Sequence, residues 1–424
     1  AKDRIFITVG EGIALDVSED YPFIEENFES RFCSQKGTMS FTAFQINCSC
    51  MICIADNAMY SGYRIFRSEN GLLHSSLINY ANTPCKFMYY ICGSIAEACK
   101  IYRRLKSDNY LSLRQKAEKT AEIDEMIGTA NFWVWNRSYE DFLYSPCESK
   151  ADPFSANGIL KIAGKLKEEG IRKAIFGIFF ENDYCVCESL RKKYGYLTAK
   201  YDNYNDVPPS DMGNYIPERR INECDYSRRR KKDFPDGITV MKDNTLAKAW
   251  ELVGFDGKKH PQNSLCAAVA AERMKEEIPD EIKKAPECKL RFIDVYGVSI
   301  SECFSEKHPL TFERAVTIKN SAYNSITEMG LVPGTEDGFD MICSSVVYSE
   351  GMMSPCLLRY NPPECGRNKA RPLGKEAAEY LKKYMLNFRC RVPLWELVWH
   401  DSVISFPYWG DSLNCCDSLM NERI

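Results

Sequence analysis

Beyond Gly128 the chain alternates between short apolar runs and amphipathic stretches, and no other feature restricts its fold as strongly. Residues 174–180 are apolar throughout, which is typical of a strand that is buried on both faces. In residues 158–169 the apolar side chains recur at helical spacing instead. Strands that alternate with helices predict βα units around a parallel sheet. The same pattern predicts strands at residues 131–135, 195–200, 290–296, 331–335 and 392–399, an apolar run at 341–348, and helices at 183–193, 264–277 and 312–329.

Eight such repeats that close on themselves form a (β/α)8 TIM-type barrel, and we predict this fold for residues 129–424. About seven strands are identifiable, so we expect a barrel without a recognisable last strand. Residues 1–95 hold short apolar and aromatic runs separated by turn residues, which predicts an antiparallel β-sandwich domain. Residues 96–128 are predicted to be a helical linker. The fold class is therefore α/β, and residues 201–253 are predicted to form a long insertion over the barrel mouth.

The charge balance and the length of the apolar runs argue against two classes of partner. The chain has 55 basic and 59 acidic residues and a net charge of -4, which does not suggest a nucleic-acid-binding protein. The densest basic run, residues 228–232, is interpreted as a solvated loop. No stretch of 18 apolar residues occurs, so we expect no membrane partner.

The 20 cysteines follow no regular spacing, which in a chain of 424 residues favours reduced thiols and a cytoplasmic location. The first residue is Ala1 and no apolar leader follows it, so a secreted location stays open. Cys48, Cys50 and Cys53 lie in a strand-like run whose alternate positions face opposite sides. Because the chain also has only four histidines, we predict no metal site and no cofactor.

Two acidic residues, Asp294 and Glu336, stand where predicted apolar strands end. An acid in this position is costly to desolvate, so it is usually either paired or used in chemistry. On residues 290–296 strand alternation places Asp294 and Tyr296 on one face, toward the barrel mouth. The same alternation separates Glu336 from Asp337, and we choose Glu336 for the site. Two carboxylates across a cleft predict glycosidic bond cleavage, either with about 5 Å between them or with about 6.5 to 9.5 Å, which leaves room for a water.

Other predicted strand ends carry aromatic and acidic side chains, which stack on sugar faces and accept hydrogen bonds from sugar hydroxyls. We therefore expect a carbohydrate, as a glycan or glycoconjugate, to be the partner. The predicted substrate-binding residues are Asp202, Tyr296, Glu350, Trp399, His400, Asp401, Trp409 and Asp411.

Several of these segments together resemble a known enzyme group. Residues 292–296, 330–338, 348–353, 393–401 and 408–411 are similar to the barrel core of glycoside hydrolase families 101 and 129, the α-N-acetylgalactosaminidases, and the resemblance covers roughly residues 97–411. It implies a β-sandwich before the barrel, Asp294 as the nucleophile and Glu336 as the acid/base of a retaining mechanism. It also implies an α-linked hexoside as substrate, with an α-N-acetylgalactosaminide as one candidate. The families' barrels continue past residue 411 into a final strand that this sequence does not show.

Two alternatives remain from the sequence. The first is a non-catalytic carbohydrate-binding or scaffold protein on a degenerate glycosidase barrel, which would bind glycans without turning them over. The second is metal-dependent hydrolysis through Asp202, Asp294 and Asp401, which activity that survives chelation would contradict.

Overall fold

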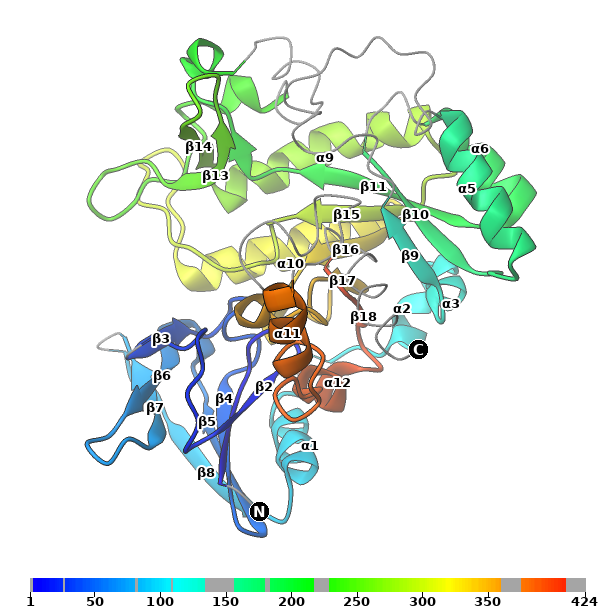
Figure 1. Cartoon of the computed structure of the whole chain (residues 1–424). Coiled ribbons are helices and arrows are strands. Elements are labelled where there is room, and N and C mark those ends of the chain that lie inside the picture. Colours follow the sequence, from blue (N-terminus) through cyan, green and yellow to red (C-terminus); the bar gives the residue numbers. More distant parts are fainter. Residues whose placement is uncertain are drawn as a thin grey trace. The chain divides into compact units, whose positions relative to one another are not determined.

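The computed structural model describes residues 3–25, 27–80, 83–107, 110–133, 156–179, 184–216, 229–359 and 375–408. The chain forms two compact units (Figure 1). Unit 1 is Ala1–Ser112, Asp337–Ser344 and Tyr348–Ile424, and unit 2 is Leu113–Glu336 with Ser345–Val347. This division differs from the predicted domains, because the segment after residue 347 joins the N-terminal strands and not residues 129–336.

Unit 1 contains two separate antiparallel sheets near its N-terminus, as the short apolar runs predicted. The larger sheet has the order β2 (Ile13–Asp16), β1 (Arg4–Ile7), β4 (Phe41–Ile46), β5 (Ser49–Ala55), β8 (Phe87–Cys92). The smaller has the order β3 (Phe28–Arg31), β6 (Ser61–Arg67), β7 (Leu73–Asn79). That these sheets form a β-sandwich stays a prediction.

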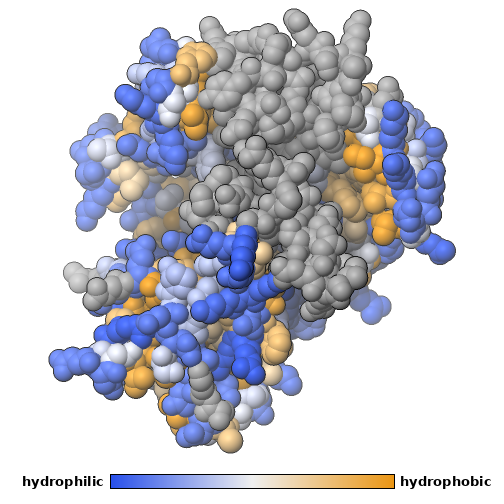
Figure 2. All heavy atoms as spheres, viewed as in Figure 1, coloured by the Kyte–Doolittle hydropathy of each residue, from blue (hydrophilic) through white to orange (hydrophobic). Residues whose placement is uncertain are grey.

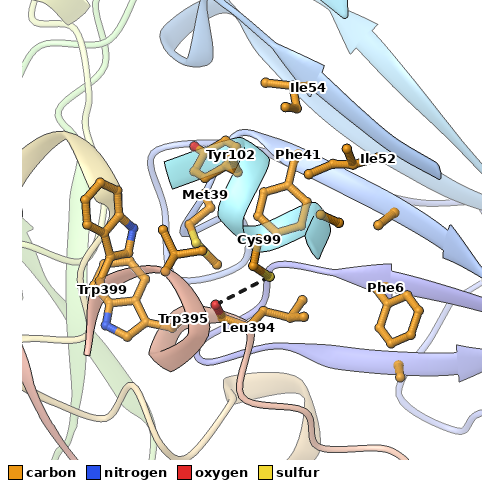
Figure 3. Close-up of a cluster of buried hydrophobic side chains, with 14 of the residues drawn as sticks. Phe6, Met39, Phe41, Ile52, Ile54, Cys99, Tyr102, Leu394, Trp395 and Trp399 are labelled. Carbon is orange, nitrogen blue, oxygen red and sulfur yellow. Dashed lines mark hydrogen bonds between the residues drawn. The ribbon is translucent and has the colours of Figure 1, made fainter. Parts of the chain in front are cut away.

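A hydrophobic core joins the larger sheet of unit 1 to two helices, α1 (Ile95–Leu105) and α12 (Leu394–Trp399). Figure 3 shows Trp395 and Trp399 of α12 in one cluster with Tyr102 of α1. The strand predicted at residues 392–399 is wrong, since this segment is helical. Its buried residues, Leu394, Trp395, Val398 and Trp399, recur at helical and not at strand spacing.

The rest of unit 1 adds short elements. The strands β17 (Tyr348–Glu350) and β18 (Ile404–Phe406) pair in parallel, and β18 lies in a segment for which no strand was predicted. The helix α11 spans Lys375–Lys383. Three 3₁₀ helices complete the described elements of unit 1: η1 (Ala58–Tyr60), η7 (Asp340–Ile342) and η8 (Cys356–Leu358).

Unit 2 is built from βα units, as the alternating pattern predicted. Its parallel strands have the order β9 (Ala130–Trp133), β10 (Ala174–Ile178), β11 (Leu197–Asn203), β15 (Leu290–Asp294), β16 (Val332–Glu336). Residues of β10, β11 and β15 are buried at every position, and in β10 this burial explains why the strand has no polar side chain. Its helices are α2 (Leu113–Ala117), α3 (Glu122–Met126), α5 (Ala156–Glu168), α6 (Cys185–Ser189), α9 (Ala267–Lys284) and α10 (Phe312–Glu328), with the π-helix η4 (Leu190–Tyr194) after α6.

The chain is thus mixed α/β, with parallel strands and separate antiparallel sheets. Among the described residues there are five parallel strands in unit 2 and two in unit 1, so closure as an eight-stranded barrel stays a prediction. The predicted insertion also has structure of its own. It contributes to a small antiparallel sheet with the order β12 (Asp206–Val207), β14 (Lys259–Ser264), β13 (Lys248–Val253), and contains the 3₁₀ helices η5 (Met212–Asn214) and η6 (Lys231–Asp233).

The surface of the described residues is mixed in character. On the face drawn in Figure 2 hydrophilic residues predominate among the coloured ones, and apolar residues lie in small groups. Across the described part of the chain, no helix combines the length and the apolar character that crossing a membrane requires.

Candidate active site

The strands β11, β15 and β16 end side by side in unit 2 and bring the two predicted acids together. Asn203 is the register partner of Asp294, the last residue of β15. On the other side, Ile293 pairs with Thr335, so that Asp294 and Glu336 each follow by one residue. Because the strands are parallel, their carboxyl ends lie at the same edge of the sheet, which is where sites of α/β sheets form.

The backbone turns sharply directly after each acid. Val295 has φ 63° and Asp337 has φ 47°, which is the left-handed region. For a β-branched residue such as Val295 this conformation is strained, and such strain is concentrated at functional sites. In this turn the Val295 N–H donates a hydrogen bond to Glu336 Oε2 at 3.2 Å. The backbone after one acid therefore helps to hold the other.

The turn at Val295 also overturns the predicted orientation of Tyr296. The alternation of β15 ends at Asp294, so that Tyr296 does not share its face. The Tyr296 hydroxyl instead donates to the carbonyl of Ala267 at 3.1 Å, and the ring meets that of Tyr323 edge-on at 5.7 Å. Tyr296 therefore packs against α9 and α10, and the structure does not place it with the acids.

Asp294 is buried and held by neutral donors. The Tyr201 hydroxyl donates to Asp294 Oδ2 at 2.5 Å, and the Asn203 amide donates to the same oxygen at 3.3 Å. Burial and then the negative charge of Glu336 raise the pKa of Asp294 well above its ordinary value, whereas the hydrogen bond from Tyr201 lowers this pKa. The carboxyl groups of Asp294 and Glu336 are thus near enough for the charge of one to act on the other.

A third carboxyl group, that of Asp206, belongs to the same cluster and was not predicted. Asp206 is buried, and its carboxylate accepts hydrogen bonds from Asn203 at 2.8 Å and from Asn205 at 2.9 Å. Burial raises its pKa, and the charge of Glu336 adds to this rise. The sequence signal available was weak, because Asp206 follows β11 by three residues and not directly.

Aromatic side chains surround Tyr201 within the sheet. The Phe179 ring stacks on that of Tyr201 with 4.6 Å between centroids, and the Trp133 ring lies 5.3 Å from both Phe179 and Phe292. These apolar neighbours remove water from the face that Tyr201 shares with Asp294, which explains why desolvation dominates the pKa of the acid.

Asp202 lies on the other face of β11 from Tyr201 and Asn203. Its carboxylate accepts a hydrogen bond from Arg291 at 3.1 Å, and both side chains are buried. The structure therefore places Asp202 in an ion pair and not with Asp294. Asp202 does line a pocket at this strand, whose walls are Phe179, Lys200, Tyr201, Asp202, Asn203, Tyr204, Arg229 and Glu277.

The remaining predicted sugar-binding residues that are described belong to unit 1. Glu350 is fully buried on β17. Trp399 is equally buried, and its ring is part of the unit 1 core drawn in Figure 3. Packing within a hydrophobic core explains this tryptophan without a sugar.

His400 and Asp401 follow α12. The His400 ring is hydrogen-bonded through Nδ1 to the carbonyl of Glu396 at 2.7 Å, and the Asp401 carboxylate accepts hydrogen bonds from Arg103 and Tyr110, both at 2.7 Å. Asp401 therefore joins α12 to the end of α1. Trp409 and Asp411 lie outside the described residues, and their roles stay predictions.

Comparisons with known proteins agree on one group. A model of the family of glycosyl hydrolases related to the GH101 family, GH129, matches residues 165–423, which is more than half of the chain. Among solved structures, the chain is similar to α-N-acetylgalactosaminidase NagBb from Bifidobacterium bifidum in complex with Gal-NHAc-DNJ, with a TM-score of 0.69 and 16% identity, covering 95% of this chain and 63% of that chain.

Two further structures of NagBb agree with the first. The complex with GalNAc has a TM-score of 0.68 and the ligand-free form 0.67, again with 16% identity and 95% of this chain covered. The match covers 64% of the chain in the GalNAc complex and 66% in the ligand-free form, so this chain spans slightly less than two thirds of their length. No curated protein sequence matches it.

Proposed function

Since the chain belongs to the family of glycosyl hydrolases related to the GH101 family, GH129, we propose that it is a retaining glycoside hydrolase that cleaves an α-linked hexoside. In this proposal Asp294 is the nucleophile and Glu336 is the acid/base. The observation that carries the proposal is the juxtaposition of these two carboxyl groups at the ends of adjacent parallel strands, where the charge of Glu336 acts on the buried Asp294.

A retaining glycosidase needs one ionised and one protonated carboxyl group, and two neighbouring carboxyl groups whose charges repel each other supply this combination when they hold a single proton. In the free site, burial and Glu336 favour the proton on Asp294. Positive charge that develops at the anomeric carbon beside Asp294 favours its ionised form instead. The proton then passes to Glu336, which donates it to the leaving oxygen while Asp294 forms the glycosyl ester. Water attacks this ester in the second step, and Glu336 takes up the proton that the water loses.

Glu336 is partly exposed, whereas Asp294 is buried and held by Tyr201 and Asn203. We propose that the sugar enters by displacing the Glu336 side chain and leaves Asp294 in place. The position of the Asp294 carboxyl group is therefore already fixed before the substrate binds.

An α-N-acetylgalactosaminide is the substrate that we propose to test first. The chain is similar in fold to structures titled as complexes of an α-N-acetylgalactosaminidase with GalNAc and with Gal-NHAc-DNJ. At 16% identity this likeness concerns the fold, and the sugar is our proposal. A panel of aryl α-hexosides should accompany the galactosaminide.

The decisive experiment is azide rescue of Asp294→Ala and Glu336→Ala on an aryl α-glycoside. Both variants should lose hydrolysis. With azide, Asp294→Ala should yield the β-glycosyl azide, because azide replaces the nucleophile directly. Glu336→Ala should yield the α-glycosyl azide, because azide attacks the glycosyl ester. The anomeric configuration of each product, measured by NMR, separates the two roles.

A surface variant, Asp280→Asn, provides the control, because Asp280 is an exposed carboxylate of α9 that pairs with exposed Lys283. It should keep wild-type turnover. Unchanged turnover in Asp294→Ala would remove Asp294 from the mechanism. Glycan binding by the wild-type chain without turnover of any α-glycoside in the panel would favour a non-catalytic carbohydrate-binding protein instead.

A further inference from the structure

Three possible metal ligands that are far apart in the sequence meet in unit 2. These are the thiols of Cys266 and Cys303 and the imidazole of His308, whose ligand atoms all lie within 4.8 Å of one another. Both cysteines are buried and reduced, and His308 is partly exposed. Among the described residues this is the one such group with three ligand atoms from cysteine and histidine.

The spacing of the three atoms suits one tetrahedral Zn²⁺. With Zn–S distances of about 2.3 Å and Zn–N distances of about 2.0 to 2.1 Å, neighbouring ligand atoms lie about 3.5 to 3.8 Å apart. The distance from Cys303 Sγ to His308 Nδ1 is 3.3 Å, so that an entering ion has to move these two atoms apart by only a few tenths of an ångström.

The His308 ring is already oriented so that its Nδ1 can bind a metal ion. Its Nε2 lies 2.8 Å from the carbonyl oxygen of Asp236, and a carbonyl can only accept, so Nε2 carries the hydrogen. The neutral ring then presents the unprotonated Nδ1 to the thiol of Cys303. A backbone carbonyl that fixes the second nitrogen in this way is the usual support of a metal-bound histidine.

The surroundings of both sulfur atoms carry partial positive charge. The N–H of Val240 donates to Cys303 Sγ at 3.4 Å. Cys266 is the N-cap of α9, so its sulfur lies at the start of this helix. A backbone N–H donor at Cys303 and the positive end of an 18-residue helix at Cys266 both favour the thiolate form of a metal ligand.

We propose that Cys266, Cys303 and His308 form a zinc site. Two thiolates and one imidazole favour Zn²⁺ over the harder ions Mg²⁺ and Ca²⁺, and three protein ligands leave one position for water. The ion would join three segments that are distant in sequence: the turn at Asp236, the start of α9, and the loop between Asp294 and α10. The site thus fastens the loop that follows Asp294 and takes no part in the proposed hydrolysis.

The test is metal binding by the purified, reduced full chain. After treatment with Zn²⁺ and removal of the excess, elemental analysis should give one zinc per chain. Replacement by Co²⁺ should produce the near-ultraviolet thiolate-to-cobalt charge-transfer band and the visible bands of tetrahedral coordination. Absence of both zinc and this spectrum from the folded wild-type chain would overturn the proposal. Isolation of a Cys266–Cys303 disulfide that resists mild reduction would overturn it as well.

Three variants assign the ligands. Cys303→Ser should weaken Co²⁺ binding by at least about 10- to 100-fold, the range seen when even a supporting group is lost. His308→Cys should keep tightly bound Co²⁺ with a more intense charge-transfer band, because it adds a third thiolate and needs no loss of structure. The control is Cys343→Ser, a buried thiol in unit 1 whose change should leave the metal content and spectrum unaltered. Equal binding by Cys303→Ser and the control would overturn the assignment.

Discussion

Replacement of Tyr201 by Phe should weaken the proposed reaction and move its pH dependence, because Asp294 loses one hydrogen bond. The Tyr201 hydroxyl donates to Asp294 Oδ2 at 2.5 Å, and both side chains are buried. A hydrogen bond to a charged group contributes about 1.5 to 3 kcal/mol, and each 1.36 kcal/mol changes a rate tenfold. If the full contribution is realised when Asp294 attacks, kcat/KM should fall by about 10- to 150-fold.

The direction of the pH shift follows from the same contact. Burial and the charge of Glu336 raise the pKa of Asp294, and the hydrogen bond from Tyr201 opposes them. Without that bond the pKa of Asp294 rises further, so a larger share of the enzyme holds Asp294 protonated at acidic pH. Because the nucleophile must be ionised, the acidic limb of the kcat/KM profile should move to higher pH.

The matched control is Tyr204→Phe, which removes the same atom from a tyrosine just beyond the same strand. The Tyr204 hydroxyl is buried and has no hydrogen-bond partner among the described residues. The assay is the pH profile of kcat/KM on the aryl α-glycoside that the wild type cleaves fastest, with thermal unfolding of both variants to verify folding. If Tyr201→Phe and Tyr204→Phe gave the same profile, the hydroxyl of Tyr201 would have no part in holding the nucleophile.

Two further changes test the environment of the site. The pKa of Asp294 is raised in the folded state, so the contribution of this carboxyl group to stability is complete below its unfolded pKa of about 3.9 and is lost as the pH rises through the folded pKa. Asp294→Asn removes the ionisable group and should therefore stabilise the fold at neutral pH by about 1 to 3 kcal/mol. In acid the variant should lose this advantage. Urea unfolding at both pH values measures this, and a variant less stable than wild type at neutral pH would contradict it. At Gly177 an added Cβ would lie 2.0 Å from the Trp133 ring, so Gly177→Ala should lower the free energy of unfolding in urea by about 1 to 3 kcal/mol. Gly213→Ala is the control and should lower it much less, because its added Cβ would meet no atom within 4 Å. Equal unfolding midpoints for the two glycine variants would contradict this prediction, because the Trp133 ring would then move aside without cost.

The elements predicted most reliably from the sequence are those in which every side chain is buried. The run at residues 174–180 could be identified as a strand because a sheet covered on both faces needs apolar residues at every position. The segment at 392–399 was assigned wrongly because its apolar residues are dense enough to fit either period. Only the burial pattern separates helix from strand, since residues 394, 395, 398 and 399 are buried and residues 396 and 397 between them are not. Dense apolar runs thus identify burial more reliably than secondary structure.

The site was predictable in part for a similar reason. Asp294 and Glu336 could be paired because both end strands, and parallel strands end at a common edge. Tyr296 could not be placed, because the left-handed turn at Val295 has no glycine to mark it. The choice of Asp202 over Tyr201 and Asn203 required knowledge of which face of β11 looks toward Asp294, and a strand buried on both faces does not carry this information in its pattern.

The valine at position 295 has a consequence for engineering. Glycine or asparagine would adopt the same left-handed backbone at lower cost, so a screen for heat resistance alone should enrich such exchanges there. The relaxed turn would have more freedom, and the N–H that now meets Glu336 would be less firmly aimed. Thermal stability and the positioning of Glu336 therefore make opposite demands on residue 295, and libraries built on this scaffold should be selected for stability and activity together.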